Sequence, residues 1–334
     1  MQRRFVVLVL ILLGAATTVA SAASAQTATR KPGDYPLTPD SLPQDGVPKG
    51  RLEGPFEFRS QIIANTVRRY WIYVPAQYTG ETPANVLVFQ DGARAINPTG
   101  ALRVPQAIEN LVFRKEIPVT IGVFITPGQR GDVFPDNVGT GNPNNRAQEY
   151  DAVDDTYARF LIDELLPEIG RKYRLTADPA RRAIGGTSSG AICAFTVAWH
   201  RPDAFRNVIS GIGSYVSIGY RAATADQPAK SGGEIYPTWI RRMPIKPLRV
   251  FLQDGSNDLD NNWGNWFLAN QQMLKAFEFA NRTADTRKDG GPRYDVRHEW
   301  GDGAHSDAHL GALLPEVLRW MFADGLRNRA PESR

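Results

Sequence analysis

Cysteine is almost absent from this sequence. Cys193 is the only one among 334 residues, so the chain cannot form an internal disulfide. Because Cys193 lies in an apolar stretch of helical spacing, we interpret it as a small buried side chain rather than as a reactive thiol. Stability must then come from the core, for which a hydrophobic content of 42% is sufficient.

The sequence also lacks blocks of like charge. It carries 39 Lys and Arg against 35 Asp and Glu, a formal net charge of +4. No basic run or aromatic-interleaved stripe stands out, so nucleic acid is not an expected partner. Residues 1–25 hold Arg3 and Arg4 and no acidic residue, so their removal lowers the charge from +4 to +2.

The apolar run at the N-terminus is too short for a membrane span. Basic Met1–Arg4 precedes apolar Phe5–Leu13, and Ala23-Ser-Ala25 has the A-x-A form of a signal-peptidase site. We therefore predict a signal peptide over residues 1–25, and a bacterial periplasmic or secreted enzyme with no membrane segment after cleavage. A simple N-terminal anchor is the alternative interpretation.

The remaining chain is predicted to contain one catalytic domain. Residues 26–54 are rich in Pro, Gly, Thr and Asp without a period, which indicates an extended arm or linker. Residues 55–326 form the expected domain, and residues 327–334 a C-terminal tail. The sequence leaves the oligomeric state open.

Strand-like and helix-like segments alternate along this domain. A hairpin is expected over residues 56–78; further strands are expected at 86–89, 119–125, 182–184, 208–212, 248–252 and 294–300, and helices at 101–113, 150–173, 190–199, 266–280 and 309–322. This alternation predicts an α/β fold, a mainly parallel central sheet with helices on both faces in a three-layer sandwich. The long loop over residues 127–145 indicates a functional or mobile segment.

The strongest motif is Gly186-Thr-Ser-Ser-Gly190, which fits the G-x-S-x-G nucleophile elbow of α/β-hydrolases. A strand, a tight turn and a helix in this order would hold Ser188 out at the strand's carboxyl end. The N–H of Ser189 then becomes one oxyanion donor. A second donor is expected from Gly92 or Ala93, which follow the 86–89 strand; an ordinary Asp-Gly turn is the alternative there.

The general base has few candidates, because the chain has only four histidines. His305 lies in a glycine-rich loop between the last strand and the last helix, where an α/β-hydrolase presents its base. His309 is the alternative. His200 ends the nucleophile helix and points away, and His298 lies in mid-strand.

The acid should follow the preceding strand, where Asp254, Asp258 and Asp260 are available. Asp254 comes at once after the strand and is interpreted as a turn or cap residue. Asp258 has the reach to return toward a histidine on the neighbouring loop, with Asp260 in reserve. The order Ser188, Asp258, His305 matches the α/β-hydrolase order.

These residues predict a serine carboxylic-ester hydrolase that acts through an acyl-enzyme on a small-molecule ester, without a cofactor. Three alternatives remain open. The first is an acyltransferase of the same fold, and the second is a catalytically silent binding protein. The third is a metal-dependent hydrolase using Asp302, His305, Asp307 and His309, although Gly303 disfavours a continuous helix through both histidines.

Seven segments in order also resemble the enterochelin-esterase-like, or esterase D, branch of the α/β-hydrolases. They are Gly186–Gly190, Pro247–Gly255, Asn257–Asp260, Gly264–Trp266, Ala269–Met273, Gly301–His305 and Leu314–Pro315. The resemblance runs from about Phe56 to Phe322 and implies the same Ser, Asp and His triad. Related enzymes include siderophore-ester, feruloyl, acetyl-xylan and S-formylglutathione esterases and some acyltransferases.

The resemblance further implies a substrate-binding set, which consists of Arg146, Glu149, Tyr150, Asn265 and Trp266. For Arg146, a salt bridge to Glu149 is the alternative role. Trp239, Trp263 and Trp266 are candidates for an acyl- or sugar-binding wall, or for core positions. Siderophore enzymes of this branch are usually cytoplasmic and carry an added N-terminal domain. An exported esterase for siderophore-type or plant-polysaccharide (feruloyl or acetyl) esters is therefore the expectation.

Overall fold

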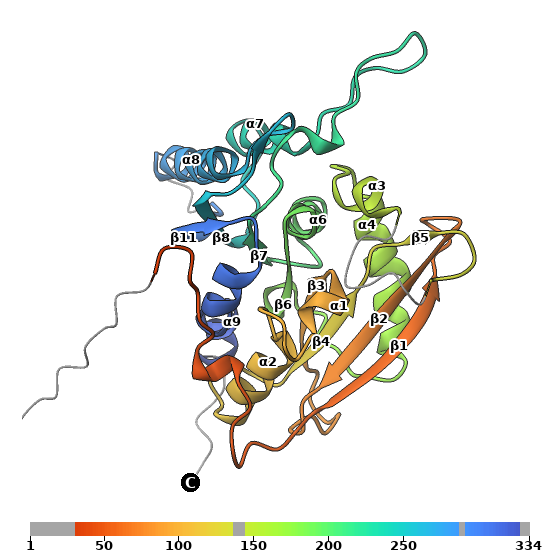
Figure 1. The fold of residues 1–334 in the computed structure, drawn as a ribbon, viewed down its shortest axis with the longest axis vertical. Helices are drawn as coiled ribbons and strands as arrows, with labels where there is room; N and C mark the ends of the chain where they lie inside the picture. The colour runs from red at the N-terminus through yellow and green to blue at the C-terminus, as the bar shows by residue number, and fades with distance from the viewer. Residues whose placement is uncertain (1–30, 136–143, 287–290, 328–334) are drawn as a thin grey trace, which may run out of the picture. The chain divides into compact units, whose positions relative to one another are not determined.

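A mostly parallel sheet forms the centre of the computed structural model (Figure 1). The structure describes residues 31–135, 144–286 and 291–327. In spatial order the strands are β1 (Arg51–Arg59), β2 (Thr66–Val74), β4 (Thr120–Ile125), β3 (Asn85–Gln90), β6 (Arg182–Thr187), β7 (Asn207–Gly211), β8 (Arg249–Asn257) and β11 (Asp295–Ala304). From β4 to β11 all neighbours are parallel, whereas β1, β2 and the short β5 (Gln129–Arg130) pair antiparallel.

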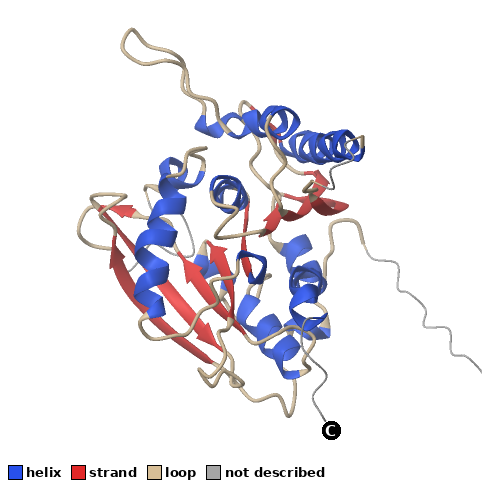
Figure 2. Cartoon of the chain, turned by 180° about the vertical axis from the view of Figure 1, so that it is seen from behind, coloured by secondary structure: helices blue, strands red, loops and turns tan. Residues whose placement is uncertain are grey.

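Helices cover both faces of this sheet, as the views from the front and from behind show (Figures 1 and 2). One face carries α2 (Val104–Phe113) and α9 (Ala308–Arg327). The opposite face carries α4 (Thr156–Arg159), a π-helical stretch (Phe160–Leu165), α5 (Leu166–Gly170), α6 (Ser189–His200) and α8 (Trp266–Asp285), and α7 (Tyr236–Arg242) packs against α8. The predicted three-layer α/β fold is confirmed.

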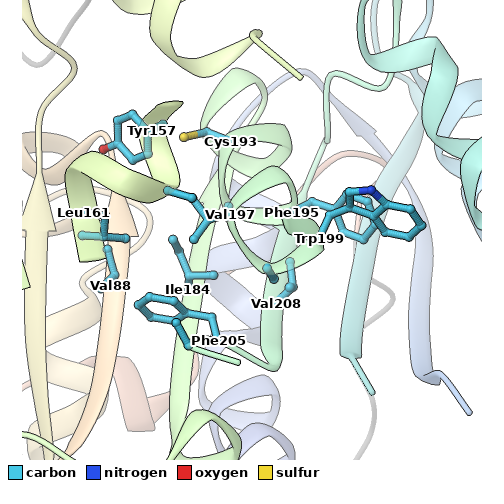
Figure 3. Packing of buried hydrophobic residues seen from close by; sticks show 14 of the residues in the cluster. Val88, Tyr157, Leu161, Ile184, Cys193, Phe195, Val197, Trp199, Phe205 and Val208 are labelled. Carbon is cyan, nitrogen blue, oxygen red and sulfur yellow. The ribbon is translucent and has the colours of Figure 1, made fainter. Parts of the chain in front are cut away.

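The central strands bury both of their faces. Val88, Ile184 and Val208 face the cluster around α6, where Phe195 and Val197 pack against them (Figure 3). Their neighbours in the sequence point to the other face, toward α2 and α9: Leu87, Ala183 and Ile209. A strand covered on both sides needs apolar residues at successive positions, which explains the unbroken apolar runs in the sequence. Cys193 lies in this core, 1% exposed, as expected.

The segment predicted as an extended arm is largely docked onto the domain. Asn110 of α2 donates hydrogen bonds to the backbone carbonyls of Asp40 and Leu42, at 2.8 Å each. The ring of Tyr35 stacks on His309 with the centroids 3.9 Å apart. The compact unit accordingly begins at Pro32 and β1 at Arg51, both before the predicted boundary at residue 55. The predicted signal peptide (residues 1–25) lies outside the described residues, as do residues 328–334.

Some local predictions differ from the structure. The helix expected over 150–173 is divided, because α3 (Arg146–Tyr150) ends before an irregular segment and α4 starts only after Asp155. The short α7 was not predicted, nor was the small hairpin of β9 (Asp260–Asn261) and β10 (Gly264–Asn265). In the loop expected over 127–145, residues 136–143 lie outside the described ranges. No helix among the described residues combines the length and apolarity needed to cross a membrane.

Candidate active site

The turn between β6 and α6 has the geometry of a nucleophile elbow. Ser188 has φ 58° and ψ −126°, a conformation that costs free energy for any residue other than glycine. Glycine is required on both sides of it. A Cβ on Gly186 would lie 2.6 Å from the carbonyl carbon of Gly190, and a Cβ on Gly190 would lie 3.0 Å from the Cβ of Gln90. The elbow therefore presents the Ser188 hydroxyl at the carboxyl edge of the sheet.

His305 reaches this hydroxyl from the connection between β11 and α9. Its Nε2 lies 2.9 Å from the Ser188 Oγ, although 117 residues separate them in the sequence. β8 and β11 pack so closely that position 255 has no room for a side chain: a Cβ on Gly255 would lie 2.2 Å from the carbonyl oxygen of Gly303. This close packing makes the approach of His305 possible. The imidazole keeps partial access to solvent, with 23% of its side chain exposed.

The other ring nitrogen of His305 contacts Asp258. Its Nδ1 lies 2.5 Å from Asp258 Oδ1, and the Asp258 side chain is fully buried. Burial alone would raise the pKa of Asp258, but hydrogen bonds from His305 and Asp254 hold it below its usual value. Asp260, the reserve candidate, is exposed in β9. The structure thus brings together the three residues predicted as a triad, and it places Asp258 rather than Asp260 against the histidine.

A second serine contacts Ser188, and sequence reasoning missed it. The fully buried Ser214 lies with its Oγ 3.2 Å from the Ser188 Oγ, and it accepts a hydrogen bond from Trp266 Nε1 at 3.1 Å. Because Ser214 accepts from the indole, its own proton is available to Ser188. The available signal was its position just after β7, at the same sheet edge as the elbow.

Trp266 supports the reacting groups from behind. It is 2% exposed, and its ring meets the His305 ring edge to face, with the centroids 5.7 Å apart. The structure thus gives Trp266 a packing role beside the reacting groups proposed below. Asn265 caps α8 by accepting a hydrogen bond from Leu268 N at 2.9 Å. The substrate contacts expected for both residues stay predictions.

The predicted oxyanion donors lie at the first turns of two helices. Ser189 begins α6, while Gly92 and Ala93 begin the short α1 (Gly92–Ala95). N–H groups in a first turn have no partner within their own helix. Asp91, at φ 53°, turns the chain into α1, and a Cβ on Gly190 would lie 3.1 Å from its Oδ2. The two helix starts are therefore adjacent, as two donors to one oxyanion require.

Arg146 holds the Asp91 turn. Its guanidinium pairs with the Asp91 carboxylate through two hydrogen bonds, at 2.9 and 2.8 Å. Although burial would lower the pKa of Arg146, Asp91 raises it, so the charge is retained. Tyr150 is fully buried below, and its hydroxyl lies 3.4 Å from both Asp91 N and Ile125 O. The alternative salt bridge from Arg146 to Glu149 is wrong, because Asp91 is the partner.

Glu149 is buried in the interior. Its carboxylate pairs with the fully buried Arg68 of β2 at 2.8 and 3.1 Å and also accepts from Gly128 N and Asn145. Glu149 therefore has a structural role, and its substrate contact stays a prediction. Removing either partner would leave a buried charge unpaired.

The proposed tryptophan wall is mostly core. Trp239 packs against Trp199 with the centroids 6.3 Å apart. Trp263 alone of the three named tryptophans is well exposed, at 42%, beside the β9–β10 hairpin.

The residues of the alternative metal site are each engaged elsewhere. The carboxylate of Asp302 accepts from the hydroxyl of Tyr35 at 2.7 Å, and Asp307 accepts from the Thr187 hydroxyl at 2.8 Å. His309 Nδ1 lies 2.9 Å from Gln253 Nε2, while His305 faces the nucleophile. Within the ranges that the structure describes, no three His, Cys, Asp or Glu side chains are grouped to hold a metal ion.

Asp151 makes the stability of the site region dependent on pH. It is 1% exposed, and burial raises its pKa to about 6 from an ordinary 3.8. The folded protein binds this proton more tightly than the unfolded chain, so stability is greatest below the unfolded pKa and falls as the pH rises through 6. We expect Asp151→Asn to stabilise the protein by about 2 kcal/mol at pH 8 and by much less near pH 4.5.

Thermal unfolding of wild type and variant at both pH values measures this difference. The exposed Asp163→Asn serves as the matched control and should change Tm equally little at either pH. A Tm difference for Asp151→Asn that does not depend on pH would contradict the buried-carboxyl account.

Comparison with known proteins places the chain in a family. Residues 60–321 match the model of a family described as "Putative esterase". The enterobactin esterase of Shigella flexneri, solved in the presence of enterobactin, has a similar structure, with a TM-score of 0.62 and 19% identity over 86% of this chain and 63% of that one. The ferric enterobactin esterase of Salmonella typhimurium gives a TM-score of 0.62 and 17% identity, with coverages of 88% and 63%.

A third similar structure is shorter than these two. The CE1 ferulic acid esterase of the anaerobic fungus Anaeromyces mucronatus gives a TM-score of 0.59 and 16% identity, and the match covers 88% of this chain and 100% of that one. The present chain thus spans less than two thirds of the enterobactin esterases and the full length of the fungal enzyme. At these identities the likeness establishes the shared α/β fold.

Proposed function

The chain belongs to the Putative esterase family, and from this premise we propose that it is a carboxylic ester hydrolase with a serine mechanism, in which Ser188, His305 and Asp258 form the triad. The observation that carries the proposal is the unbroken line of contacts from Ser188 Oγ through both nitrogens of His305 to Asp258, at 2.9 and 2.5 Å. A nucleophile, a base in reach of it and a third group that orients the base are the parts that acyl transfer requires.

The proposed reaction begins as Ser188 Oγ attacks the ester carbonyl carbon while His305 takes its proton. The carbonyl oxygen becomes an oxyanion, which the N–H groups of Ser189 and of Gly92 or Ala93 receive. His305 then gives the proton to the departing alkoxide, and an alcohol leaves. Water then attacks the carbonyl carbon of the acyl-enzyme and gives one proton to His305. His305 passes this proton to Ser188 Oγ as the bond to the acyl group breaks, which releases the acid and restores the enzyme.

We propose an exported enzyme acting on a small ester of siderophore or plant-polysaccharide type. Export is supported by the N-terminal pattern of basic, apolar and A-x-A segments. The substrate class is supported by similarity to structures described as enterobactin and ferulic acid esterases. Arg146 contributes by fixing Asp91 and hence the oxyanion loop.

Covalent labelling tests the proposal. A fluorophosphonate should react once per molecule, abolish activity and appear by mass spectrometry on the peptide that contains Ser188. Prior incubation with EDTA should leave hydrolysis of p-nitrophenyl acetate unchanged. Loss of activity on chelation would instead support a metal-dependent hydrolase, and a label on another serine would overturn the assignment. Added alcohols that divert the product from acid to new ester would identify an acyltransferase.

A further inference from the structure

A second carboxyl group lies directly behind the proposed triad. Asp254 belongs to β8 and is fully buried. Its Oδ1 accepts from Gly255 N at 2.7 Å, and its Oδ2 accepts from Asn270 Nδ2 at 2.6 Å. Asn270, itself fully buried on α8, also donates to the carbonyl of Gly213 at 2.9 Å. Asp254 is thus held in place by two neutral groups, the N–H of Gly255 in its own strand and the side-chain amide of Asn270 on α8.

Among the residues that the structure describes, no cation pairs with Asp254. Among the ion pairs found between described residues, none includes it, and an isolated buried carboxylate is strongly destabilising. The group that it faces, at hydrogen-bonding range, is the carboxyl of Asp258. Two buried carboxyls in contact do not both ionise. Burial first, and Asp258 next, raise the pKa of Asp254 to about 9, while the pKa of Asp258 is lowered.

Asp258 has an acceptor that this proton would fill. Its Oδ1 is occupied by His305 Nδ1 and by Leu259 N, each at 2.5 Å. Its Oδ2 is buried and accepts no hydrogen bond from any N–H or hydroxyl group of the described residues. A buried acceptor without a donor is costly, and a protonated Asp254 supplies the missing donor.

We propose that Asp254 is a protonated positioning residue that donates its carboxyl proton to Oδ2 of Asp258. The proposal rests on the triad role of Asp258 given above. Held at both oxygens, the Asp258 carboxylate cannot rotate away from His305, and the pair carries a single negative charge. The hydrogen bonds then converge on Asp258, one from Asp254 and one from His305 Nδ1, while Ser188 donates to His305 Nε2.

Few titratable groups face this pair. The connection from β11 to α9 contributes His305, α8 contributes the neutral Asn270, and the segment after β7 contributes the carbonyl of Gly213. A change in the protonation of Asp254 would therefore act directly on the protonation of His305. The acidic limb of the pH profile of kcat/KM would shift as a result.

Two variants separate a neutral donor from a carboxylate. Asp254→Asn keeps the shape and an N–H donor, so we expect kcat/KM within about threefold of wild type and an unchanged acidic limb. Asp254→Leu removes the donor, and we expect kcat to fall by about 10- to 100-fold with little change in KM and the acidic limb to move to higher pH. If Asp254 were ionised, Asp254→Asn would remove a negative charge and move that limb to lower pH, which would overturn the proposal.

Infrared spectroscopy gives a readout that does not depend on turnover. At pH 7 the difference spectrum between wild type and Asp254→Asn should contain a protonated-carboxyl C=O band that disappears only as the pH rises past about 9. The band should also be present in a Ser188→Ala background. The exposed Asp163→Asn is the control and should remove no such band. Absence of the band refutes a protonated Asp254 whether or not the triad assignment holds, and a Ser188→Ala variant with full activity refutes the triad alone.

Discussion

Ser188→Ala is expected to lower kcat for ester hydrolysis by about 10⁵-fold, because removal of the attacking oxygen eliminates the acyl-enzyme route. The expectation is specific to this residue, since the elbow sets its strained backbone (φ 58°) and its hydroxyl alone lies 2.9 Å from His305 Nε2. Ser214, the other hydroxyl in contact, is fully buried and cannot meet a substrate. Substrate binding should survive, because alanine leaves the Ser189 N–H and the surrounding walls in place.

The measurement is steady-state hydrolysis of p-nitrophenyl acetate and butyrate by residues 26–334. Ser231→Ala, which lies before α7 and outside the site, is the matched control and should retain the wild-type rate. Wild-type activity in Ser188→Ala would show that the elbow carries another function. If neither protein turned over these esters, the comparison would move to feruloyl, acetyl-xylan and catecholate esters.

The three residues of the proposed triad can be selected from the sequence because their signals are local. The glycines at 186 and 190 follow from the close approach of backbone within five residues, so the sequence alone places Ser188. His305 follows from the scarcity of histidine and its place after the last strand. Asp258 is favoured over Asp260 because its position in the loop lets it reach back to a histidine on the neighbouring loop. The structure places Asp258 against the imidazole and leaves Asp260 exposed.

The supporting residues were not predictable because their partners are distant in the sequence. Arg146 and Glu149 are three residues apart on one short helix, which suggested a mutual salt bridge. They pair instead with Asp91 after β3 and with Arg68 of β2, and only the assembled sheet determines those contacts. The position of Asp254 directly after the expected strand predicts a turn or cap residue; its burial against Asp258 depends on β8, α8 and β11 together.

The docked arm and the interrupted helix also depend on contacts that a local sequence pattern does not contain. Residues 32–50 have the composition of a linker, yet Asn110 and His309 fix Asp40 and Tyr35 on the domain through contacts that no local pattern reveals. The helix expected over 150–173 was inferred from apolar spacing, which continues across the break that precedes Asp155. Periodicity predicts which face is buried more reliably than where a helix starts.

Asp258→Asn is expected to lower kcat by about 10⁴-fold with little loss of stability, because the amide keeps the size of the carboxyl group but cannot stabilise an imidazolium and favours the wrong tautomer of His305. The pKa of Asp258 is already lowered, with burial opposed by hydrogen bonds from His305 and Asp254. Because the pKa of this carboxyl is lowered, the charged form is present at neutral pH. It is lost only as the pH falls below the range in which an ordinary Asp carboxyl titrates. The deficit of the variant should therefore be constant between about pH 6 and 9.

The control for this prediction is Asp260→Asn, which alters the neighbouring exposed carboxylate and should leave the rate unchanged. Measuring both variants across the pH range distinguishes the two acids directly. Loss of activity in Asp260→Asn with retention in Asp258→Asn would mean that the loop rearranges when substrate binds and brings Asp260 to the histidine. Equal small losses in both would mean that His305 is oriented mainly by its packing against Trp266, at a centroid distance of 5.7 Å, and that the carboxylate contributes little to the transition state.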